Sequence, residues 1–414
     1  MEPRTPQDRR KVRTVHYGER NVRNTLLPTL CLALLASCAT DEVELAARRL
    51  EPAIVAYRDG KEDPRGLIDE RMRELGLPGL SIAVIDDYEI DWARGFGVVR
   101  ADHSAPITTD TLFQAASISK SVAAVGIMTL VEKGRLGLDD EVNGILKSWK
   151  IPVSDGIDGS SVTVRHLLGH TASLTVHGFR GYEPGERRPT VVQILDGRAP
   201  ANNPAVRVET SPGSRWQYSG GGYTVAQLAV SDLTGEGFAD FMRSTVLNPL
   251  RMNRSSYEQP LPDEKRFDAA VGHDAEGHVI RGLWRIHPEL AAAGLWTTPT
   301  ELARFAIEMQ LSLEGRSSRV LSQGTTRLML TVDELGRDVG EGSLRVDYAL
   351  GFALLDHGQV FAHSGSNAGF KVIFMATRRG GKGVVVMSNA HGSAALLREV
   401  TTAVRNVYGW PRRR

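Results

Sequence analysis

Apolar and polar residues follow two kinds of pattern along this chain, one typical of strands and the other of helices. The β-rich runs are 80–85, 88–93, 370–376 and 383–388. Asp86-Asp87 separates the first two runs as a tight turn separates two strands, and a glycine-containing segment at 378–382 separates the last two. The sequence therefore predicts one β-hairpin near each end of the chain.

Helical spacing fills most of the chain between and around these hairpins. The helical stretches are 41–75, 117–133, 163–168, 224–234, 300–313 and 394–407. Strands at both ends with helices between them predict an α/β (α+β) fold, in which one antiparallel sheet is built from both ends and a helical domain is inserted. We expect the α/β part at about 45–116 and 340–414 and the all-helical part at about 121–335.

The first forty residues have the pattern of a targeting segment. Arg-rich polar residues precede an apolar run at 26–35, which is too short to span a bilayer as a helix. Leu35-Ala36-Ser37-Cys38 resembles a bacterial lipobox, in which the cysteine is lipidated and becomes the new N-terminus. Residues 1–37 are thus expected to be a lipoprotein signal peptide and 38–414 the mature protein, exported and membrane-anchored toward the periplasm or cell exterior, with the outer membrane as one destination. The alternative is a plain secretory peptide that is cut nearby.

Composition and charge exclude several classes of protein. The 414 residues are 41% hydrophobic and 24% charged, as in an ordinary globular protein. The chain has 50 Lys and Arg residues and 49 Asp and Glu residues, so its charges nearly balance. No overall positive field therefore indicates nucleic acid as a partner. The two cysteines cannot form a disulfide framework or a zinc site, and His166 and His170 lack a third ligand at metal spacing. We expect no metal and no cofactor.

A candidate nucleophile lies at the start of the helix predicted at 117–133. Ser117 and Lys120 are three residues apart, so they share a helix face and the amine can reach the hydroxyl. A buried lysine near a helix N-terminus can take the serine proton, and the free N–H groups there can hold an oxyanion. The other interpretation is an N-cap serine with a solvated lysine, which is the commoner meaning of an isolated Ser-x-x-Lys. The apolar residues that follow favour burial and therefore catalysis.

Two further motifs follow in a recognisable order. Tyr218-Ser219-Gly220 precedes two more glycines, which we interpret as a flexible bend that aims the phenol, and His363-Ser364-Gly365-Ser366 follows a short strand-like run. With Ser117-x-x-Lys120, these motifs resemble the serine β-lactamase and penicillin-binding protein superfamily, closest to its branch of class C β-lactamases, D-alanyl-D-alanine carboxypeptidases and esterases. Supporting similarities lie at 166–171, 294–298, 301–305 and 350–352.

The resemblance implies a role for each motif. Ser117 would be the nucleophile, Lys120 its base, and Tyr218 the group that shares the proton with Lys120 and passes it to the leaving group. The N–H groups of Ser117 and Ser366 would form the oxyanion hole, while Ser364 hydrogen-bonds the substrate and Gly365 allows its close approach. The resemblance also implies a β-lactamase/transpeptidase-like fold, with an antiparallel sheet flanked by helices and an inserted helical domain.

Two departures from the family pattern affect the expected substrate. The catalytic-site residue His363 stands where many relatives have Lys, as in some D-amino-acid peptidases, and Gly220 stands where Tyr-x-Asn motifs have the amide that holds the acyl side chain. We therefore expect a serine hydrolase that forms an acyl-enzyme with small esters or amides, acting as an esterase or D-amino-acid peptidase or carboxypeptidase before a β-lactamase. The alternative is a non-catalytic or slowly deacylating penicillin-binding lipoprotein. The partners expected are this small-molecule substrate and a lipid anchor.

Overall fold

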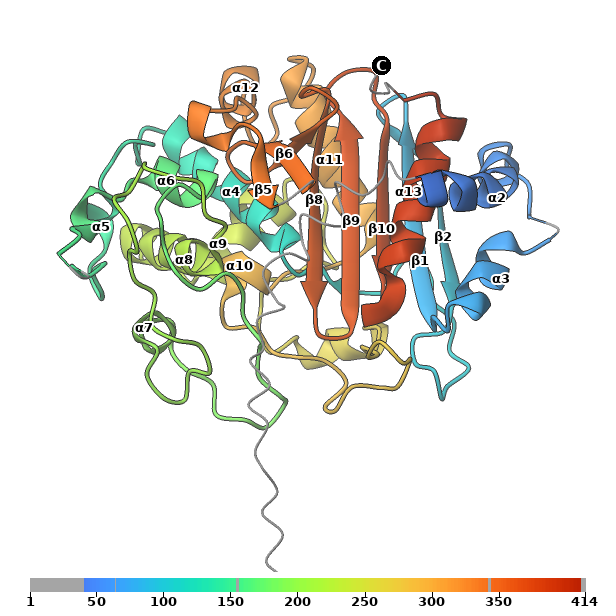
Figure 1. Cartoon of the computed structure of the whole chain (residues 1–414), viewed down its shortest axis with the longest axis horizontal. Coiled ribbons are helices and arrows are strands. Elements are labelled where there is room, and N and C mark those ends of the chain that lie inside the picture. Colours follow the sequence, from blue (N-terminus) through green and yellow to red (C-terminus); the bar gives the residue numbers. More distant parts are fainter. Residues whose placement is uncertain (1–40, 64, 154–155, 342–343, 411–414) are drawn as a thin grey trace, which may run out of the picture.

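An antiparallel sheet of eight strands forms the centre of the computed structural model, which describes residues 41–63, 65–153, 156–341 and 344–410 (Figure 1). The strands are β1 (Gly79–Asp86), β2 (Glu89–Gly97), β5 (Val339–Glu341), β6 (Leu344–Tyr348), β7 (Ala353–Leu355), β8 (Val360–Asn367), β9 (Phe370–Thr377) and β10 (Gly383–Ser388). Their order is β2-β1-β10-β9-β8-β7-β6-β5, so β1 pairs with β10 from the far end of the sequence. The predicted sheet built from both ends of the chain is confirmed.

Both predicted hairpins are present, with one shift at the first turn. β1 continues to Asp86, which pairs with Glu89, so the turn residues are Asp87 and Tyr88 and not Asp86-Asp87. Asp87 and Tyr88 have φ angles of 46° and 65°, the left-handed conformation that matches the twist of a two-residue hairpin. The sequence of the Asp86-Asp87 pair does not reveal that Asp86 is still paired with the neighbouring strand.

Helices cover both faces of the sheet. α2 (Asp41–Arg58) and α13 (Ala394–Val407) pack on one face, and α11 (Pro299–Leu313) packs on the other (Figure 1). The helix predicted over 41–75 is in fact two helices, α2 and α3 (Leu67–Glu74). Gly60, just after α2, has a φ of 70°, and Gly66, directly before α3, has a φ of 61°, so the helical conformation is interrupted between them.

The helical region lies beyond the β8 side of the sheet (Figure 1). Its elements and those linking it to the sheet are β3 (Phe113–Gln114), α4 (Ile118–Glu132), α5 (Val142–Ile145), α6 (Val164–Gly169), α7 (Val191–Asp196), α8 (Gly220–Thr234), α9 (Phe238–Met242), α10 (Leu290–Ala293), β4 (Trp296–Thr297) and α12 (Gln323–Met329). Short 3-10 turns lie at Gly159–Ser161, Asp263–Asp268, Glu334–Gly336 and His391–Ser393, and a π turn lies at Arg243–Leu247.

α8 begins four residues earlier than its periodicity predicts. Ser219 caps it by accepting a hydrogen bond from the Gly222 N–H at 2.9 Å, so Gly220 and the two glycines after it form its first turn. Their interpretation as a flexible bend is wrong. The physical reason is close packing, because a Cβ on Gly221 would lie 2.7 Å from the Thr175 carbonyl oxygen.

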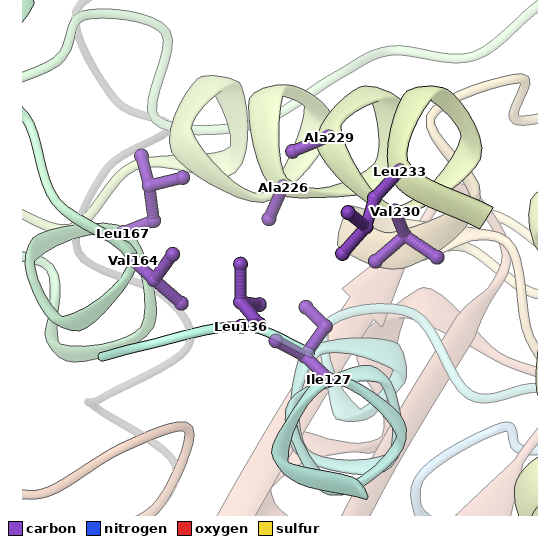
Figure 2. Close-up of a pocket in the computed structure, with 8 residues that line it drawn as sticks. All are labelled: Ile127, Leu136, Val164, Leu167, Ala226, Ala229, Val230 and Leu233. Carbon is purple, nitrogen blue, oxygen red and sulfur yellow. The ribbon is translucent and has the colours of Figure 1, made fainter. Parts of the chain in front are cut away.

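α4, α6 and α8 pack around a small apolar pocket, shown in Figure 2. It is lined by Ile127, Leu136, Val164, Leu167, Ala226, Ala229, Val230 and Leu233. Its volume of about 10 Å³ is near the minimum for one water molecule, and it offers that water no polar partner. This pocket is therefore a packing defect of the core that joins the three helices.

None of the described helices combines the length and apolar character needed to cross a membrane. The predicted signal peptide and Cys38, the predicted lipidation site, lie outside the described residues.

Candidate active site

Ser117 stands at a sharp turn of the backbone immediately before α4. Ala116 has a φ of 48°, a conformation that costs free energy for a residue with a side chain and is often found at functional sites. The Ser119 hydroxyl donates to the Ala116 carbonyl at 2.6 Å and accepts from the Leu295 N–H at 3.0 Å, which fixes the turn. The Ser117 hydroxyl is thus presented at a fixed point at the start of a buried helix.

The amine of Lys120 points at this hydroxyl. It donates hydrogen bonds to Ser117 Oγ at 3.2 Å and to the carbonyl oxygen of Ala292 in α10 at 2.7 Å. The side chain is only 2% exposed, and Nζ lies 5.0 Å from the ring centroid of Tyr218. The structure therefore brings Ser117, Lys120 and Tyr218 together, from positions up to 101 residues apart in the sequence.

Tyr218 is held in place by His170. The backbone N–H groups on either side of the tyrosine, those of Gln217 and Ser219, donate to the carbonyl oxygen and Nδ1 of His170 at 2.7 and 3.1 Å. The two rings lie 4.2 Å apart. Since Nδ1 accepts a hydrogen bond, the ring proton of neutral His170 is on Nε2. Burial, followed by the charge of Lys120, lowers the pKa of His170 well below 6.5.

The sequence indicates residues 166–171 only as a supporting similarity and as a pair of histidines without a third metal ligand. In the fold, this stretch forms helix α6 and its end. Thr163 and His166 form a capping box at the start of α6, and His170 ends the helix with a φ of 61°. α6 therefore ends at the residue that fixes Tyr218, a relationship that no local pattern could reveal.

Strand β8 runs past Ser117. β7 pairs with β8 only at Val360–Ala362, so no described strand covers that side of residues 363–367. A Cβ at Gly365 would lie 2.4 Å from the Ala115 carbonyl oxygen and 3.1 Å from the Ser117 backbone nitrogen. Only glycine permits this approach, which places the β8 backbone directly beside the Ser117 N–H.

Ser364, Ser366 and Asn367 lie on the same strand. Ser364 is fully buried, and Ser366 Oγ accepts a hydrogen bond from Lys371 Nζ at 3.1 Å. The Asn367 amide donates to Gln114 Oε1 at 2.9 Å and to the Ala293 carbonyl at 3.2 Å. These bonds tie the end of β8 to β3 and to α10, the helix whose carbonyl holds Lys120.

His363 is buried beside the site and both its ring nitrogens are engaged. Nδ1 lies 2.7 Å from the Ser364 carbonyl oxygen and must donate to it, so Nε2 accepts from the Tyr348 hydroxyl at 3.2 Å. Burial and the charge of Lys120 lower the pKa of His363 to about 3. Its ring centroid is 6.4 Å from that of Tyr218. His363 is therefore a neutral group that holds the β8 backbone, and it does not supply the positive charge of a lysine.

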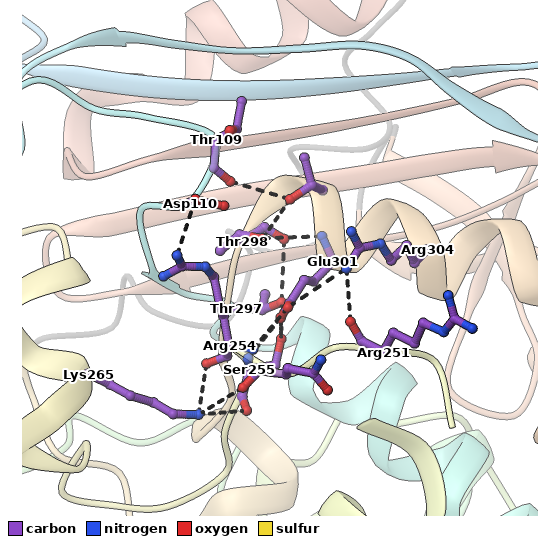
Figure 3. A network of polar contacts seen from close by, with 12 residues as sticks. Thr109, Asp110, Arg251, Arg254, Ser255, Lys265, Thr297, Thr298, Glu301 and Arg304 are labelled. Carbon is purple, nitrogen blue, oxygen red and sulfur yellow. Dashed lines mark hydrogen bonds and ion pairs between the residues drawn. The ribbon is translucent and has the colours of Figure 1, made fainter. Parts of the chain in front are cut away.

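Figure 3 shows how the start of α11 is anchored by polar contacts. The Glu301 carboxylate, 4% exposed, accepts hydrogen bonds from the backbone N–H groups of Arg254 and Ser255 at 2.9 and 2.8 Å and from the Ser255 hydroxyl at 2.6 Å. Thr298 caps the helix at the Glu301 N–H. The preceding strand β4 pairs with β3, so this network supports the segment that leads into Ser117.

A second buried polar pair lies close to Lys120. His287 and Glu289 are both 0% exposed, and His287 Nδ1 is 3.9 Å from Glu289 Oε2. Burial lowers the pKa of His287 to about 3 and raises the pKa of Glu289 to about 8, so both are neutral at pH 7. The Glu289 carbonyl accepts from the N–H groups of Ala292 and Ala293 and so begins α10. The sequence offered no signal for this pair.

The chain is similar in sequence to a known family and to curated proteins. The sequence model of the family named Beta-lactamase matches residues 65–408. Protein flp of Staphylococcus aureus strain N315 is 22% identical over 349 residues, which cover 80% of this chain and 63% of that protein. The chain thus spans less than two thirds of the length of this curated relative.

Two solved structures are similar over most of the chain. The octameric penicillin-binding protein homologue from Pyrococcus abyssi is 26% identical, with a TM-score of 0.63 over 82% of this chain and 76% of that one. The D-amino acid amidase from Ochrobactrum anthropi SV3, complexed with L-phenylalanine amide, is 21% identical, with a TM-score of 0.64 over 82% of this chain and 96% of that one. Both have the same fold as the present structure.

Proposed function

Because the chain belongs to the beta-lactamase family, we propose that it is a serine hydrolase that acts through an acyl-enzyme on Ser117. The observation that carries this proposal is the 3.2 Å contact between Lys120 Nζ and Ser117 Oγ, made by an amine that is also fixed to the Ala292 carbonyl. A nucleophile and a base within hydrogen-bond distance, with the base oriented by a third group, are the requirements for nucleophilic catalysis.

Acylation would proceed as follows. Lys120, in the form that has given up its own extra proton, takes the Ser117 proton while Oγ forms a bond to the substrate carbonyl carbon, and the N–H groups of Ser117 and Ser366 bind the oxyanion. The tetrahedral intermediate then collapses, the bond to the leaving group breaks, and the leaving group receives the proton through Tyr218. His363 acts as a positioning residue, since it hydrogen-bonds the carbonyl of Ser364, which would contact the substrate.

Deacylation would repeat these steps with water as the attacking group. Water attacks the ester of Ser117, the same base removes its proton, and the released carboxylic acid leaves Ser117 protonated again. No metal or cofactor enters any of these steps.

We propose small esters or amides as the substrate class, with esterase or D-amino-acid peptidase activity ahead of β-lactam hydrolysis. Gly220 lacks the side-chain amide that would hold an acyl amide, and neutral His363 lacks the charge that would attract a carboxylate. Similarity to a D-amino acid amidase supports amides of amino acids as the first alternative to esters. A protein that acylates with penicillin and then deacylates slowly is the second candidate, because the missing amide also removes a contact around Lys120.

A labelling experiment tests the proposal. A fluorophosphonate probe should modify Ser117, as identified by peptide mass spectrometry, and Ser117→Ala should abolish both the adduct and hydrolysis of nitrophenyl esters. A lasting penicillin adduct without ester turnover would support the slow acyl-enzyme. Absence of any adduct on the folded wild-type protein would contradict a hydrolytic function. Faster turnover of nitrocefin than of every ester would reverse the substrate order.

We also propose that the protein is an exported lipoprotein anchored through Cys38. The support is the apolar run at 26–35 followed by Leu35-Ala36-Ser37-Cys38. The wild type should incorporate labelled palmitate, and Cys38→Ala should not. On cell fractionation, the wild type should be found with the membranes and the variant in the soluble fraction. Equal membrane association of both proteins would contradict the lipid anchor.

A further inference from the structure

The segment Thr175 to Phe179 runs along the first turn of α8, on the side of Tyr218. The N–H groups of Gly220 and Gly221 donate to the carbonyls of His177 and Val176, both at 2.9 Å. The Ser219 hydroxyl donates to the Thr175 carbonyl at 2.8 Å. Three bonds therefore fix this segment against the motif that carries Tyr218.

The space beside Gly220 is already occupied by this segment. A Cβ at Gly220 would lie 3.0 Å from the His177 carbonyl oxygen and 3.0 Å from Cε2 of the Phe179 ring. A larger side chain would therefore have to displace the segment. Gly220 therefore has no empty space beside it. The segment from Thr175 to Phe179 fills the place of an asparagine side chain, and we call it the wall of the site.

His177 forms the part of this wall that is nearest to the catalytic groups. Its ring centroid lies 4.7 Å from that of Tyr218 with the planes 37° apart, and its side chain is partly exposed. Burial, followed by the charge of Lys120, lowers the pKa of His177 to about 4, so the ring is neutral at pH 7. A neutral imidazole and a phenyl ring offer flat, weakly polar surfaces to a bound group.

The backbone directly before His177 is held in a strained conformation. Val176, directly before it, has a φ of 64°, which is a strained conformation for a β-branched residue. Such strain persists only where surrounding contacts determine the conformation, and it is frequent at ligand sites. The wall is therefore preformed and does not need to close on a substrate.

We propose that His177 and Phe179 are the specificity-determining residues for the acyl group, and that the preferred substrates have a flat, apolar acyl group of the phenylacetyl or benzoyl type. This inference rests on the proposed acyl-enzyme function, because it takes the acyl group to lie against the segment that fills the space beside Gly220. Stacking against two rings favours such a group over acetyl by about tenfold in kcat/KM.

Nitrophenyl esters that differ only in the acyl group test the inference. Wild type should prefer phenylacetyl over acetyl by about tenfold, and His177→Ala and Phe179→Leu should each reduce the ratio of kcat/KM severalfold, mainly through KM for the aromatic ester. Arg180→Ala is the matched control, because Arg180 directly follows this segment, is exposed, and should leave the ratio unchanged when replaced. Gly220→Ala should lower the ratio as well, since its methyl group must displace Phe179 or the His177 backbone.

Fluorophosphonate labelling of Ser117 separates the two proposals. The probe needs an activated serine and little acyl recognition, so the wild type and the Arg180→Ala control should react at the same rate. If labelling fails in the wild type, the hydrolase proposal fails. If labelling is retained but His177→Ala and Phe179→Leu leave the acyl preference unchanged, the specificity inference is overturned while the hydrolase proposal stands. A changed preference for the leaving group alone would also overturn it.

Discussion

The hydroxyl of Tyr348 in β6 donates a hydrogen bond to Nε2 of His363 in β8, at 3.2 Å. The other ring nitrogen of the histidine donates to the Ser364 carbonyl. These two contacts fix the tautomer and the orientation of a ring that is 3% exposed, where β8 passes Ser117. A residue from outside the three sequence motifs thus determines the geometry of the third motif.

We expect Tyr348→Phe to destabilise the protein without changing its fold. The variant leaves a buried ring nitrogen without its donor, which costs about 1–3 kcal/mol in the free energy of unfolding. Urea denaturation of the variant and of the wild type measures this cost. A variant as stable as the wild type would show that the Tyr348 hydroxyl does not satisfy His363.

Local patterns predicted the parts of this protein whose determinants are close in sequence. The hairpin at 370–388 and the helix at 394–407 follow from buried β-rich runs and from helical periodicity. Ser117 and Lys120 were paired because residues three apart share a helix face.

The parts that were missed depend on tertiary contacts. The clamp on Tyr218 by His170 joins residues 48 positions apart. The carbonyl that holds Lys120 belongs to Ala292, whose side chain carries no chemical signal. The three glycines at 220–222 indicated a bend because glycine is typical of turns, whereas tertiary packing required them inside a helix.

A variant without His287 should become more stable relative to the wild type as the pH falls. The unfolded histidine binds a proton below about pH 6.5, whereas the folded one does so only near pH 3, so its contribution to stability is full above 6.5 and is lost as the pH falls toward 3. His287→Phe removes this loss. The difference in unfolding free energy between variant and wild type should grow by at most about 1.4 kcal/mol per pH unit from 6.5 to 4. A difference independent of pH would contradict a neutral buried His287.

Glu289 should produce the opposite dependence, although it lies only 3.9 Å from His287. Burial raises its pKa from the usual 4.5 to about 8, so the folded protein retains a proton that the unfolded chain loses. The stability from this group is present below pH 4.5 and is lost as the pH rises toward 8. Glu289→Gln cannot titrate and should become more stable relative to wild type over that window, as thermal unfolding at several pH values would reveal. A constant difference from pH 5 to 8 would show that Glu289 is already ionised in the folded state.

The network in Figure 3 predicts unequal effects for two charged residues on α11. Glu301→Ala leaves the buried N–H groups of Arg254 and Ser255 without an acceptor and should cost about 3–5 kcal/mol. Arg304→Ala removes an ion pair of 4.0 Å and a hydrogen bond of 2.9 Å to the Arg251 carbonyl from a half-exposed side chain, and should cost only about 1 kcal/mol. Chemical denaturation of both variants checks the contrast. Equal costs would mean that the carboxylate acts through Arg304 and not through the backbone.

A methyl group at Gly365 should impair catalysis more than it impairs folding. The Cβ would lie 2.4 Å from the Ala115 carbonyl oxygen, so β8 and the turn before Ser117 must separate. Movement of Ser366 relative to the Ser117 N–H would misplace an oxyanion donor, a loss typically worth about 100-fold or more in kcat. Gly144→Ala is the matched control, because Gly144 is an exposed helical residue with no atom within 4 Å of a Cβ, and it should retain full activity. Ester hydrolysis and fluorophosphonate labelling should fall together in Gly365→Ala, since both need the oxyanion donors. If the folded variant hydrolyses esters at the wild-type rate, the backbone of β8 does not form the oxyanion hole, and the binding site for the substrate carbonyl must lie elsewhere around Ser117.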